Sequence, residues 1–426
     1  MPHQEALTLL APVDPDRVGS LTQLMKDLAL DPGHNAVLPF GEVKGCHFGR
    51  VLFMPSSVDL KGNTIAPQLL VLSDCDGSAD EHLRAIVDRA GPGIDTLFGH
   101  CEGYPDLRKA NGSAQRERLA FLKGKQQNIK ANYVHRQGRT VEQVRNEAKL
   151  REALQAFIGK HGLANLPALE ARKQLRAHVR STPSLAWAAE PAEGVDLGYK
   201  VKNALHFTTL PLGLVAFGGV VLPALALLLL LIRMQEARDY TEGLRPTPEQ
   251  VKELVALEDF FAHNGFTAGG YVKPGLLRQV VVQSVLPLIG WGTRHLFTED
   301  SLAGVKSIHF ARWIPLDGGR RVVFCSNFDG SMESYNNDFI DLVGWGLNLI
   351  FSNGYGYPRT SWLVSGGASH EQEFKDYLRR HQIPTPVWYS AYPQLTAANV
   401  VRNAKLRAGL SGFMTEREAQ QWLKLF

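Results

Sequence analysis

The chain contains one sequence unit twice. Residues 43–105 read VKGCHFGRVLFMP and then LLVLSDCDGSADEHLRAIVDRAGPGIDTLFGHCEGYP, and residues 305–358 read VKSIHFARWIPLD and then RVVFCSNFDGSMESYNNDFIDLVGWGLNLIFSNGYGYP. A later stretch, VRNEAKLREAL from residue 144, returns as VRNAKLRAGL from residue 401. A repeat of about 110 residues has domain size, so the two copies must share one core or build two similar ones.

Each copy predicts the element order β-α-β-β-α-β, which is that of a ferredoxin-like unit. In the first copy the apolar patterns predict strands at 6–13, 47–54 and 68–74 and a helix at 16–30. Ser78 and Ser331 are suited to cap the second helices. We expect closing strands at 94–100 and 347–353, and the first strand of the second copy between Gln279 and Leu288.

A sheet of this kind has helices on one face, and two such units can bury their open faces against each other. In this topology the chain resembles the dimeric α+β-barrel superfamily, over most of residues 5–105 and 280–358. Dye-decolourising peroxidases and chlorite dismutases, which hold haem, and cofactor-free monooxygenases belong to it. The resemblance implies an α+β fold in which two ferredoxin-like repeats pair within one chain as an intramolecular barrel.

The predicted organisation has six segments. They are repeat 1 (1–105), a basic helical extension (106–200), an apolar membrane segment (205–234), a linker helix (235–274), repeat 2 (275–358) and a C-terminal extension that repeats part of 106–160 (359–426).

The apolar segment predicts contact with a membrane. Residues 210–232 carry no charge, and a helix of this length reaches roughly 35 Å, enough to cross a bilayer. One crossing would place the two copies on opposite sides, whereas pairing needs them on one side. Because Gly218, Gly219 and Pro223 lie mid-run, we expect a hairpin that dips into one leaflet. The run 275–297 is either a core helix broken at Pro287 or a membrane-facing amphipathic helix.

Charge is distributed unevenly along the chain. Residues 106–180 hold 17 Lys and Arg against 6 Asp and Glu, although the whole chain carries only +4. We expect this stretch to rest against anionic lipid headgroups; nucleic acid is the less favoured partner because no recognition motif is present. The N-terminus has no secretory-signal pattern, and four cysteines without paired spacing fit a reducing compartment. The expected location is therefore the cytoplasmic side of a membrane.

The best candidate site combines His309 and Arg312, at the start of one strand, with Asp329 at the end of the next. His309 suits a haem-iron ligand, and thus the metal-ligating role, or a general base. The alternative for His309 is a structural histidine that hydrogen-bonds to the opposing turn. The alternative for Asp329 is a turn carboxylate that accepts backbone N–H groups, and the presence of Asp76 at the same position of the first copy favours this role. Alternation places His309 and Arg312 on opposite sheet faces unless a bulge intervenes.

The peroxidase resemblance rests on a partial motif. These enzymes have G-x-x-D-G with its aspartate beside haem, and the chain offers S-D-C-D-G at 73–77 and S-N-F-D-G at 326–330, both without the first glycine. It implies haem, with His309 or His295 as the ligand. Residues that distinguish the second copy, Trp313, Asn327 and Tyr335 among them, are expected to line a substrate pocket.

Two functions follow from these observations. The first is a membrane-associated oxidoreductase, haem-dependent and peroxidase-like or monooxygenase-like, that takes an apolar or lipid-derived substrate from the leaflet. The alternative is a non-catalytic membrane-surface module for lipid binding or assembly. Phosphate-loop, dinucleotide, zinc-protease and nucleophile-elbow motifs do not occur in the sequence.

Overall fold

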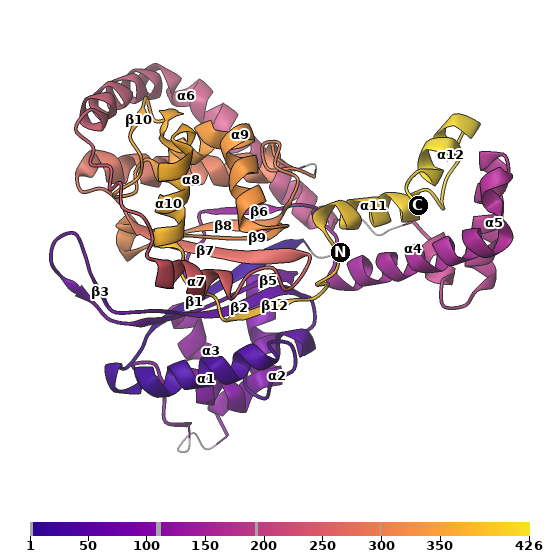
Figure 1. Cartoon of the computed structure of the whole chain (residues 1–426), viewed down its shortest axis with the longest axis horizontal. Coiled ribbons are helices and arrows are strands. Elements are labelled where there is room, and N and C mark those ends of the chain that lie inside the picture. The colour runs from indigo at the N-terminus through magenta and orange to yellow at the C-terminus, as the bar shows by residue number, and fades with distance from the viewer. Residues whose placement is uncertain (1–2, 108–111, 192–194, 299) are drawn as a thin grey trace.

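The computed structural model describes the chain except residues 1–2, 108–111, 192–194 and 299, and combines helices with small antiparallel sheets (Figure 1). The strands are β1 (Gln4–Pro12), β2 (Cys46–Met54), β3 (Ser57–Val58), β4 (Thr64–Ile65), β5 (Gln68–Asp76), β6 (Ala131–Val134), β7 (His263–Tyr271), β8 (Ile308–Leu316), β9 (Arg321–Asp329), β10 (Thr360–Ser361), β11 (Ser365–Gly366) and β12 (Val387–Ser390). The helices are α1 (Val18–Leu30), α2 (Ala79–Phe98), α3 (Ala114–Lys125), α4 (Val141–His161), α5 (Ala168–Ser181), α6 (Leu197–Glu236), α7 (Pro248–Val255), α8 (Leu276–His295), α9 (Met332–Phe351), α10 (Glu371–His381), α11 (Ala397–Ala408) and α12 (Glu416–Leu423).

Two four-stranded sheets are built by exchange between the halves of the chain. Their strand orders are β1-β5-β2-β12 and β6-β8-β9-β7, with every neighbouring pair antiparallel. Strand β12 comes from the end of the chain yet pairs with β2, and β6 precedes the second half yet pairs with β8. Each half therefore completes the sheet of the other.

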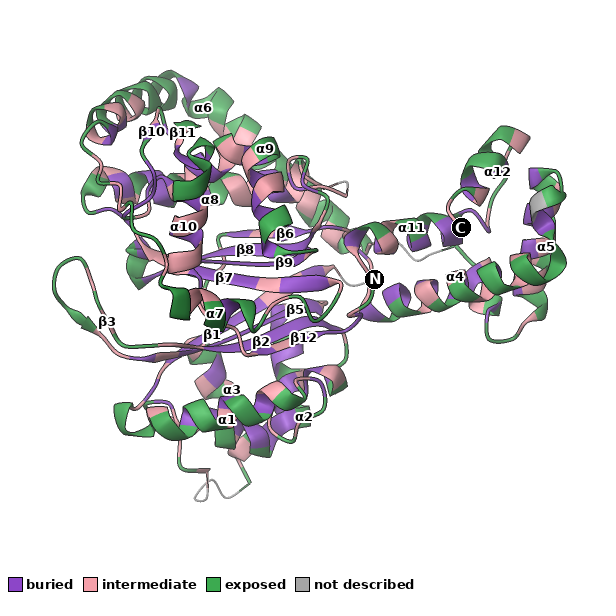
Figure 2. Cartoon of the chain, viewed as in Figure 1, coloured by how far each residue is buried: buried purple, intermediate pink, exposed green. Residues whose placement is uncertain are grey.

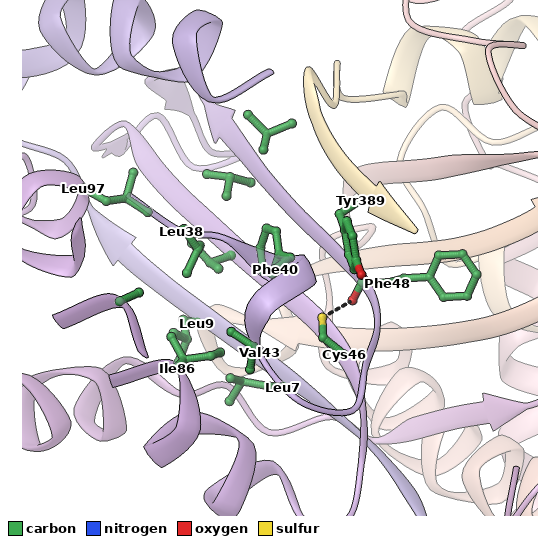
Figure 3. Packing of buried hydrophobic residues seen from close by; sticks show 14 of the residues in the cluster. Leu7, Leu9, Leu38, Phe40, Val43, Cys46, Phe48, Ile86, Leu97 and Tyr389 are labelled. Atoms are coloured by element: carbon green, nitrogen blue, oxygen red, sulfur yellow. Dashed lines mark hydrogen bonds between the residues drawn. The ribbon is translucent and has the colours of Figure 1, made fainter. Parts of the chain in front are cut away.

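The sheets face each other, and helices cover their outer faces. Leucines of β1, β2 and β5 pack against β8 and β9 between the sheets. Helices α1, α2 and α3 cover the first sheet, and α8, α9 and α10 the second (Figure 1). Tyr389, on the exchanged β12, joins the first core beside Phe40, with ring centroids 6.2 Å apart (Figure 3). The exchange is thus fixed by buried aromatic surface as well as by backbone pairing.

The predicted closing strands at 94–100 and 347–353 are wrong, because most of both segments is helical, at the ends of α2 and α9. Ile94, Leu97 and Phe98 recur at helical spacing and are all buried, so a helix buries the three together. Each sheet instead gains its fourth strand from the other half, at the edge beside β2 or β8.

The first strand of the second half is not within residues 279–288, which are helical in α8. It is β7, which pairs with β9 as β1 pairs with β5. Its glycines and few branched residues give a weak strand signal, whereas the valines of α8 imitate one. At Gly265 a Cβ would lie 2.4 Å from the Trp388 ring, so the exchanged strand requires glycine there.

Helices α4, α5, α11 and α12 form an arm that extends from the sheets (Figure 1). The repeated VRN segments lie on α4 and α11, which pack against each other. Inside the arm, fully buried Glu147 of α4 pairs with Arg139 and with Arg407 of α11, so ion pairs as well as apolar packing join the two helices.

The apolar segment is one helix, α6, so the expected hairpin is wrong. Gly218, Gly219 and Pro223 lie within it, and its 40 residues correspond to roughly 60 Å. Figure 2 shows most of α6 exposed, and Figure 1 shows it passing over the second half. Helix α8 likewise continues through Pro287. Both prolines are accommodated within helices rather than ending them.

Candidate functional site

His309 and Asp329 form a pair that the first half reproduces. Nε2 of His309 lies 2.7 Å from Oδ1 of Asp329, and Nε2 of His47 lies 2.9 Å from Oδ1 of Asp76. Each histidine sits at a β-bulge, where the register shifts between Ile308 and Phe310 or between Cys46 and Phe48. The alternation of side chains in the sequence could not decide whether a bulge occurs here. A bulge is present at both histidines, and each bulge orients its histidine toward the carboxylate at the end of the neighbouring strand.

Each aspartate also receives the start of a long helix. Oδ2 of Asp76 accepts the N–H of Val141 at 3.0 Å, and Oδ2 of Asp329 accepts that of Ala397 at 2.8 Å. These are the first residues of α4 and α11, which follow directly after the exchanged strands. A carboxylate at a helix N-terminus is stabilised by the free N–H groups and the helix dipole. The two His–Asp pairs thus share one structural role, which is to hold in place the helices that follow the exchanged strands β6 and β12.

Arg312 is separate from this pair and reaches into the first sheet. It donates to the carbonyl of Leu7 at 2.8 Å and to the carboxylate of Asp74. Its counterpart Arg50 donates to the carbonyl of Phe266 at 2.8 Å and to the side chain of Asn327. The matched arginines therefore cross between the sheets in opposite directions, each satisfied by the other half.

The three residues expected to form a pocket lie in different surroundings. Asn327 is between the sheets, where it donates to Asp74 at 3.0 Å and accepts from Trp388 at 3.1 Å. Tyr335 stacks on Phe328 and bonds Ser326, while buried Trp313 packs against Phe324. All three side chains are buried, with exposed fractions of 2 to 3%. They serve as parts of the packed interior.

The surroundings of His309 do not fit haem. Its ring is enclosed by those of Phe48, His263 and Tyr392, with centroids 5.5, 5.0 and 6.1 Å away. Three rings therefore occupy the space beside the imidazole in which a porphyrin would have to lie. His295 is elsewhere, at the contact between α6 and α8, and its Nε2 faces Nδ1 of His206 at 2.8 Å.

A small metal ion suits the cluster better. His263, His309 and Asp329 each offer a ligand atom, and these atoms lie within 4.8 Å of one another. Burial, aided by neighbouring His309 and opposed by the backbone of Leu395, lowers the pKa of His263 to about 3, so its imidazole is neutral at pH 7. Two imidazoles and a carboxylate form a donor set that binds zinc.

His263 was missed by sequence reasoning because β7 was not recognised. In the first half its place is taken by Gln4, which pairs in register with Asp76 as His263 does with Asp329. Gln4 donates to Asp76 at 3.2 Å. An alignment that included the first strands would have exposed this difference, which makes the three-ligand set a property of the second half alone.

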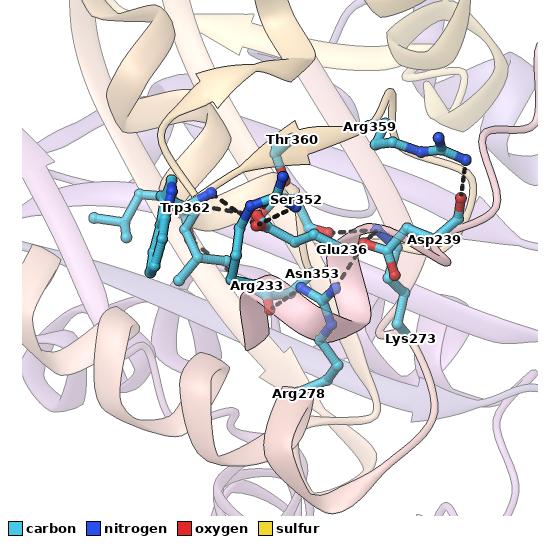
Figure 4. Close-up of polar contacts among 12 residues, drawn as sticks. Arg233, Glu236, Asp239, Lys273, Arg278, Ser352, Asn353, Arg359, Thr360 and Trp362 are labelled. Atoms are coloured by element: carbon cyan, nitrogen blue, oxygen red, sulfur yellow. Dashed lines mark hydrogen bonds and ion pairs between the residues drawn. The ribbon is translucent and has the colours of Figure 1, made fainter. Parts of the chain in front are cut away.

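A second polar cluster fastens the C-terminal end of α6 (Figure 4). Fully buried Glu236 accepts hydrogen bonds from Thr360 Oγ1 and from the N–H groups of Trp362 and Leu363, at 2.7 to 2.8 Å. Three residues later, Oδ2 of Asp239 accepts hydrogen bonds from Arg278 of α8 and from Lys273 in the turn before α8. Ile232 packs beside Val281 and Leu363 in the same region. Polar and apolar contacts thus hold this end of the helix.

The N-terminal part of α6 is held by the other end of α8. Phe207 stacks on Trp291 with centroids 5.4 Å apart, next to the contact between His206 and His295. Arg294 donates to Asn203 at 2.5 Å. Because one helix of the body contacts both parts of α6, the two ends of α6 are attached to the same side of the molecule.

The middle of α6 has little cover. Val215 is 86% exposed and Val220 76%, and the neighbouring leucines and Phe217 are exposed as well. Among the described residues, α6 is the one helix whose length and composition suffice to cross a membrane. Trp345 of α9 and Trp362 of the loop that binds Glu236 are exposed as well. Both α9 and this loop contain other residues that pack against α6. The chain therefore presents a long apolar helix at its surface.

Comparison with known protein families, curated proteins and solved structures finds no match to the chain.

Proposed function

We propose that this is a membrane-surface protein whose helix α6 lies in the plane of one leaflet and presents the two-sheet body to lipid. The observation that carries the proposal is the attachment of both ends of α6 to α8 while its apolar middle stays exposed. A helix apolar on all sides is stable in hydrocarbon and costly to expose to water. Since both ends return to one body, an in-plane position keeps the paired halves on one side, which we take to be cytoplasmic.

Depth measurements test this orientation. The four native cysteines are buried, so a cysteine placed at Leu212, Val220 or Leu227 takes an environment-sensitive label selectively. In vesicles carrying quenchers at known depths, an in-plane helix gives three similar depths. A spanning helix gives depths that differ by about 1.5 Å per residue, and that result would contradict the proposal.

Vesicle flotation tests membrane binding itself. The double substitution Val215→Asp and Val220→Asp should abolish flotation, because two charges in hydrocarbon cost several kcal/mol. Phe413→Asp is the matched control, since Phe413 is 91% exposed in the loop between α11 and α12. Loss of flotation in both variants, or in neither, would reject α6 as the anchor. Self-association through α6 in the absence of lipid would favour a second copy as its partner.

We further propose that the halves are ferredoxin-like repeats paired in one chain, as in dimeric α+β barrels, with an exchanged strand added at one edge of each sheet. The support is the order β1-β5-β2, which matches β7-β9-β8, and the placement of a helix after the first and third strand of each half. Separately produced halves should be unstable alone and should assemble when mixed, because each lacks one strand of its own sheet.

A second candidate function is metal-assisted oxidation of an apolar or lipid-derived substrate, in which two histidines and one carboxylate would hold a redox-active ion such as Fe²⁺ and dioxygen would be the oxidant. It is favoured by the restriction of the His263, His309 and Asp329 set to the second half. Cobalt binding, followed by its visible absorption, tests it. His263→Gln should abolish the signal and His47→Gln should retain it. A wild-type protein that binds no cobalt removes this candidate.

A further inference from the structure

A cavity of about 460 Å³ opens where the apolar part of α6 ends. Leu231 and Met234 of α6 and Leu277 of α8 line one part of it. Cationic side chains line another part, and Tyr240 and Tyr355 complete the wall. Apolar, aromatic and cationic groups thus meet in one cavity at the end of the proposed membrane helix. The apolar groups lie toward α6 and the cations beyond its end, as the acyl chains and the headgroup follow each other in a lipid.

The cavity carries more positive than negative charge. Lys273 and Arg278 are buried and both bind the same oxygen, Oδ2 of Asp239, at 2.8 and 2.6 Å. Arg238 lines the cavity, is exposed, and has no carboxylate partner within the described ranges. Three cations therefore line the cavity together with one carboxylate, Asp239, and even with Glu236 buried nearby the positive charges are in excess.

The buried cations are held in position by the protein. Lys273 Nζ also donates to the carbonyl of Ser352 at 2.7 Å, and Arg278 contacts Asn353 at 3.4 Å (Figure 4). Burial lowers the pKa of Lys273, while Asp239 and Glu236 oppose that shift. A second anion would oppose it further. The cavity at the other end of α6 contains Glu5 together with Lys130 and Arg294, so its excess charge is smaller.

We infer that the cavity lined by Arg238, Lys273 and Arg278 binds the phosphate of an anionic phospholipid, with its acyl chains directed along α6. This inference rests on the proposed membrane attachment and names the lipid class that it favours. Arg238 supplies a flexible guanidinium that can bind phosphate in two-point fashion, while the buried pair supplies fixed charge. Phosphatidylglycerol and phosphatidylserine carry the net charge that the cavity lacks.

Binding to vesicles of phosphatidylcholine, with and without one-fifth phosphatidylglycerol, tests the inference. Wild-type protein should prefer the anionic vesicles, and Arg238→Gln should weaken that binding about fivefold. The matched control is Arg245→Gln, which removes an exposed arginine on the same loop that does not line the cavity. Because Arg238 is exposed, its substitution leaves the core intact.

Each outcome separates the site from the anchor. Equal weakening by Arg238→Gln and Arg245→Gln means diffuse surface attraction and overturns the site, while leaving α6 as the anchor. Failure to bind either vesicle overturns the anchor instead. Titration with dihexanoyl phosphatidylglycerol as monomers should show one site that Arg238→Gln weakens. If inorganic phosphate binds that site as tightly, the ligand is a soluble anion and the lipid assignment fails.

Discussion

Oδ2 of Asp329 accepts a 2.8 Å hydrogen bond from the backbone N–H of Ala397, the first residue of α11. The same carboxylate holds His309 through its other oxygen. One side chain therefore joins a strand of the second sheet to the helix that follows the exchanged strand of the first. Asp76 does the same for α4, which explains why His and Asp-Gly-Ser recur in both copies without requiring two active sites.

Asp329→Asn should destabilise the protein by about 1–3 kcal/mol, because it removes a charge from a helix N-terminus and weakens a buried hydrogen bond. Asp76→Asn should cost a similar amount, since its contacts are equivalent. Urea unfolding of both variants measures this. A large cost at Asp76 with none at Asp329 would show that the second carboxylate has lost the structural role.

His263 should make the fold sensitive to acid. Its pKa of about 3 in the folded state lies below the usual 6.5 of the unfolded state, so protonation favours unfolding. The contribution of neutral His263 to the free energy of unfolding is fully present above pH 6.5. It falls as the pH drops from 6.5 towards 3, and about 2 kcal/mol is lost at pH 5. His263→Gln, which copies Gln4, should reduce this loss in urea titrations between pH 7 and 5. An unchanged pH profile would contradict the buried neutral imidazole.

Gly265→Ala should interfere with the exchanged strand, because the new Cβ would meet the Trp388 ring at 2.4 Å. Overpacking of this kind costs about 1–3 kcal/mol. Gly269→Ala, on the same strand, meets the flexible tip of Ile383 at 3.2 Å and should cost less. Thermal unfolding ranks the two variants, and hydrogen exchange of the β12 amides reports whether β12 has moved. A reversed ranking would place β12 differently against β7.

Glu236→Ala should loosen the C-terminal end of α6. The substitution leaves the hydroxyl of Thr360 and the N–H groups of Trp362 and Leu363 without their acceptor, at a cost of about 3 kcal/mol. Hydrogen exchange should accelerate at residues 362 and 363. Glu249→Ala, on exposed α7, is the control and should leave these amides protected. Equal protection in both variants would mean that Glu236 does not fasten the helix.

The sequence predicted the elements whose signals are local. The duplication, the strands β1, β2 and β5, and the long apolar run were readable because periodicity and composition report directly on a nearby sheet face or an uncharged helix. The His47 and His309 matches were also visible. Their geometry was not, because a bulge is set by pairing between strands rather than by either strand alone.

Only the tertiary structure decided how the halves combine. Strand β7 has glycine at position 265 because Trp388, more than 120 residues later in the chain, packs against it, and its three glycines leave the strand with little sequence signal of its own. The exchange of β6 and β12, the meeting of His263 with His309, and the return of both ends of α6 to α8 depend on contacts between distant segments. Local patterns specify which face of an element is buried, but the partner that buries it is chosen by the packing of the whole chain.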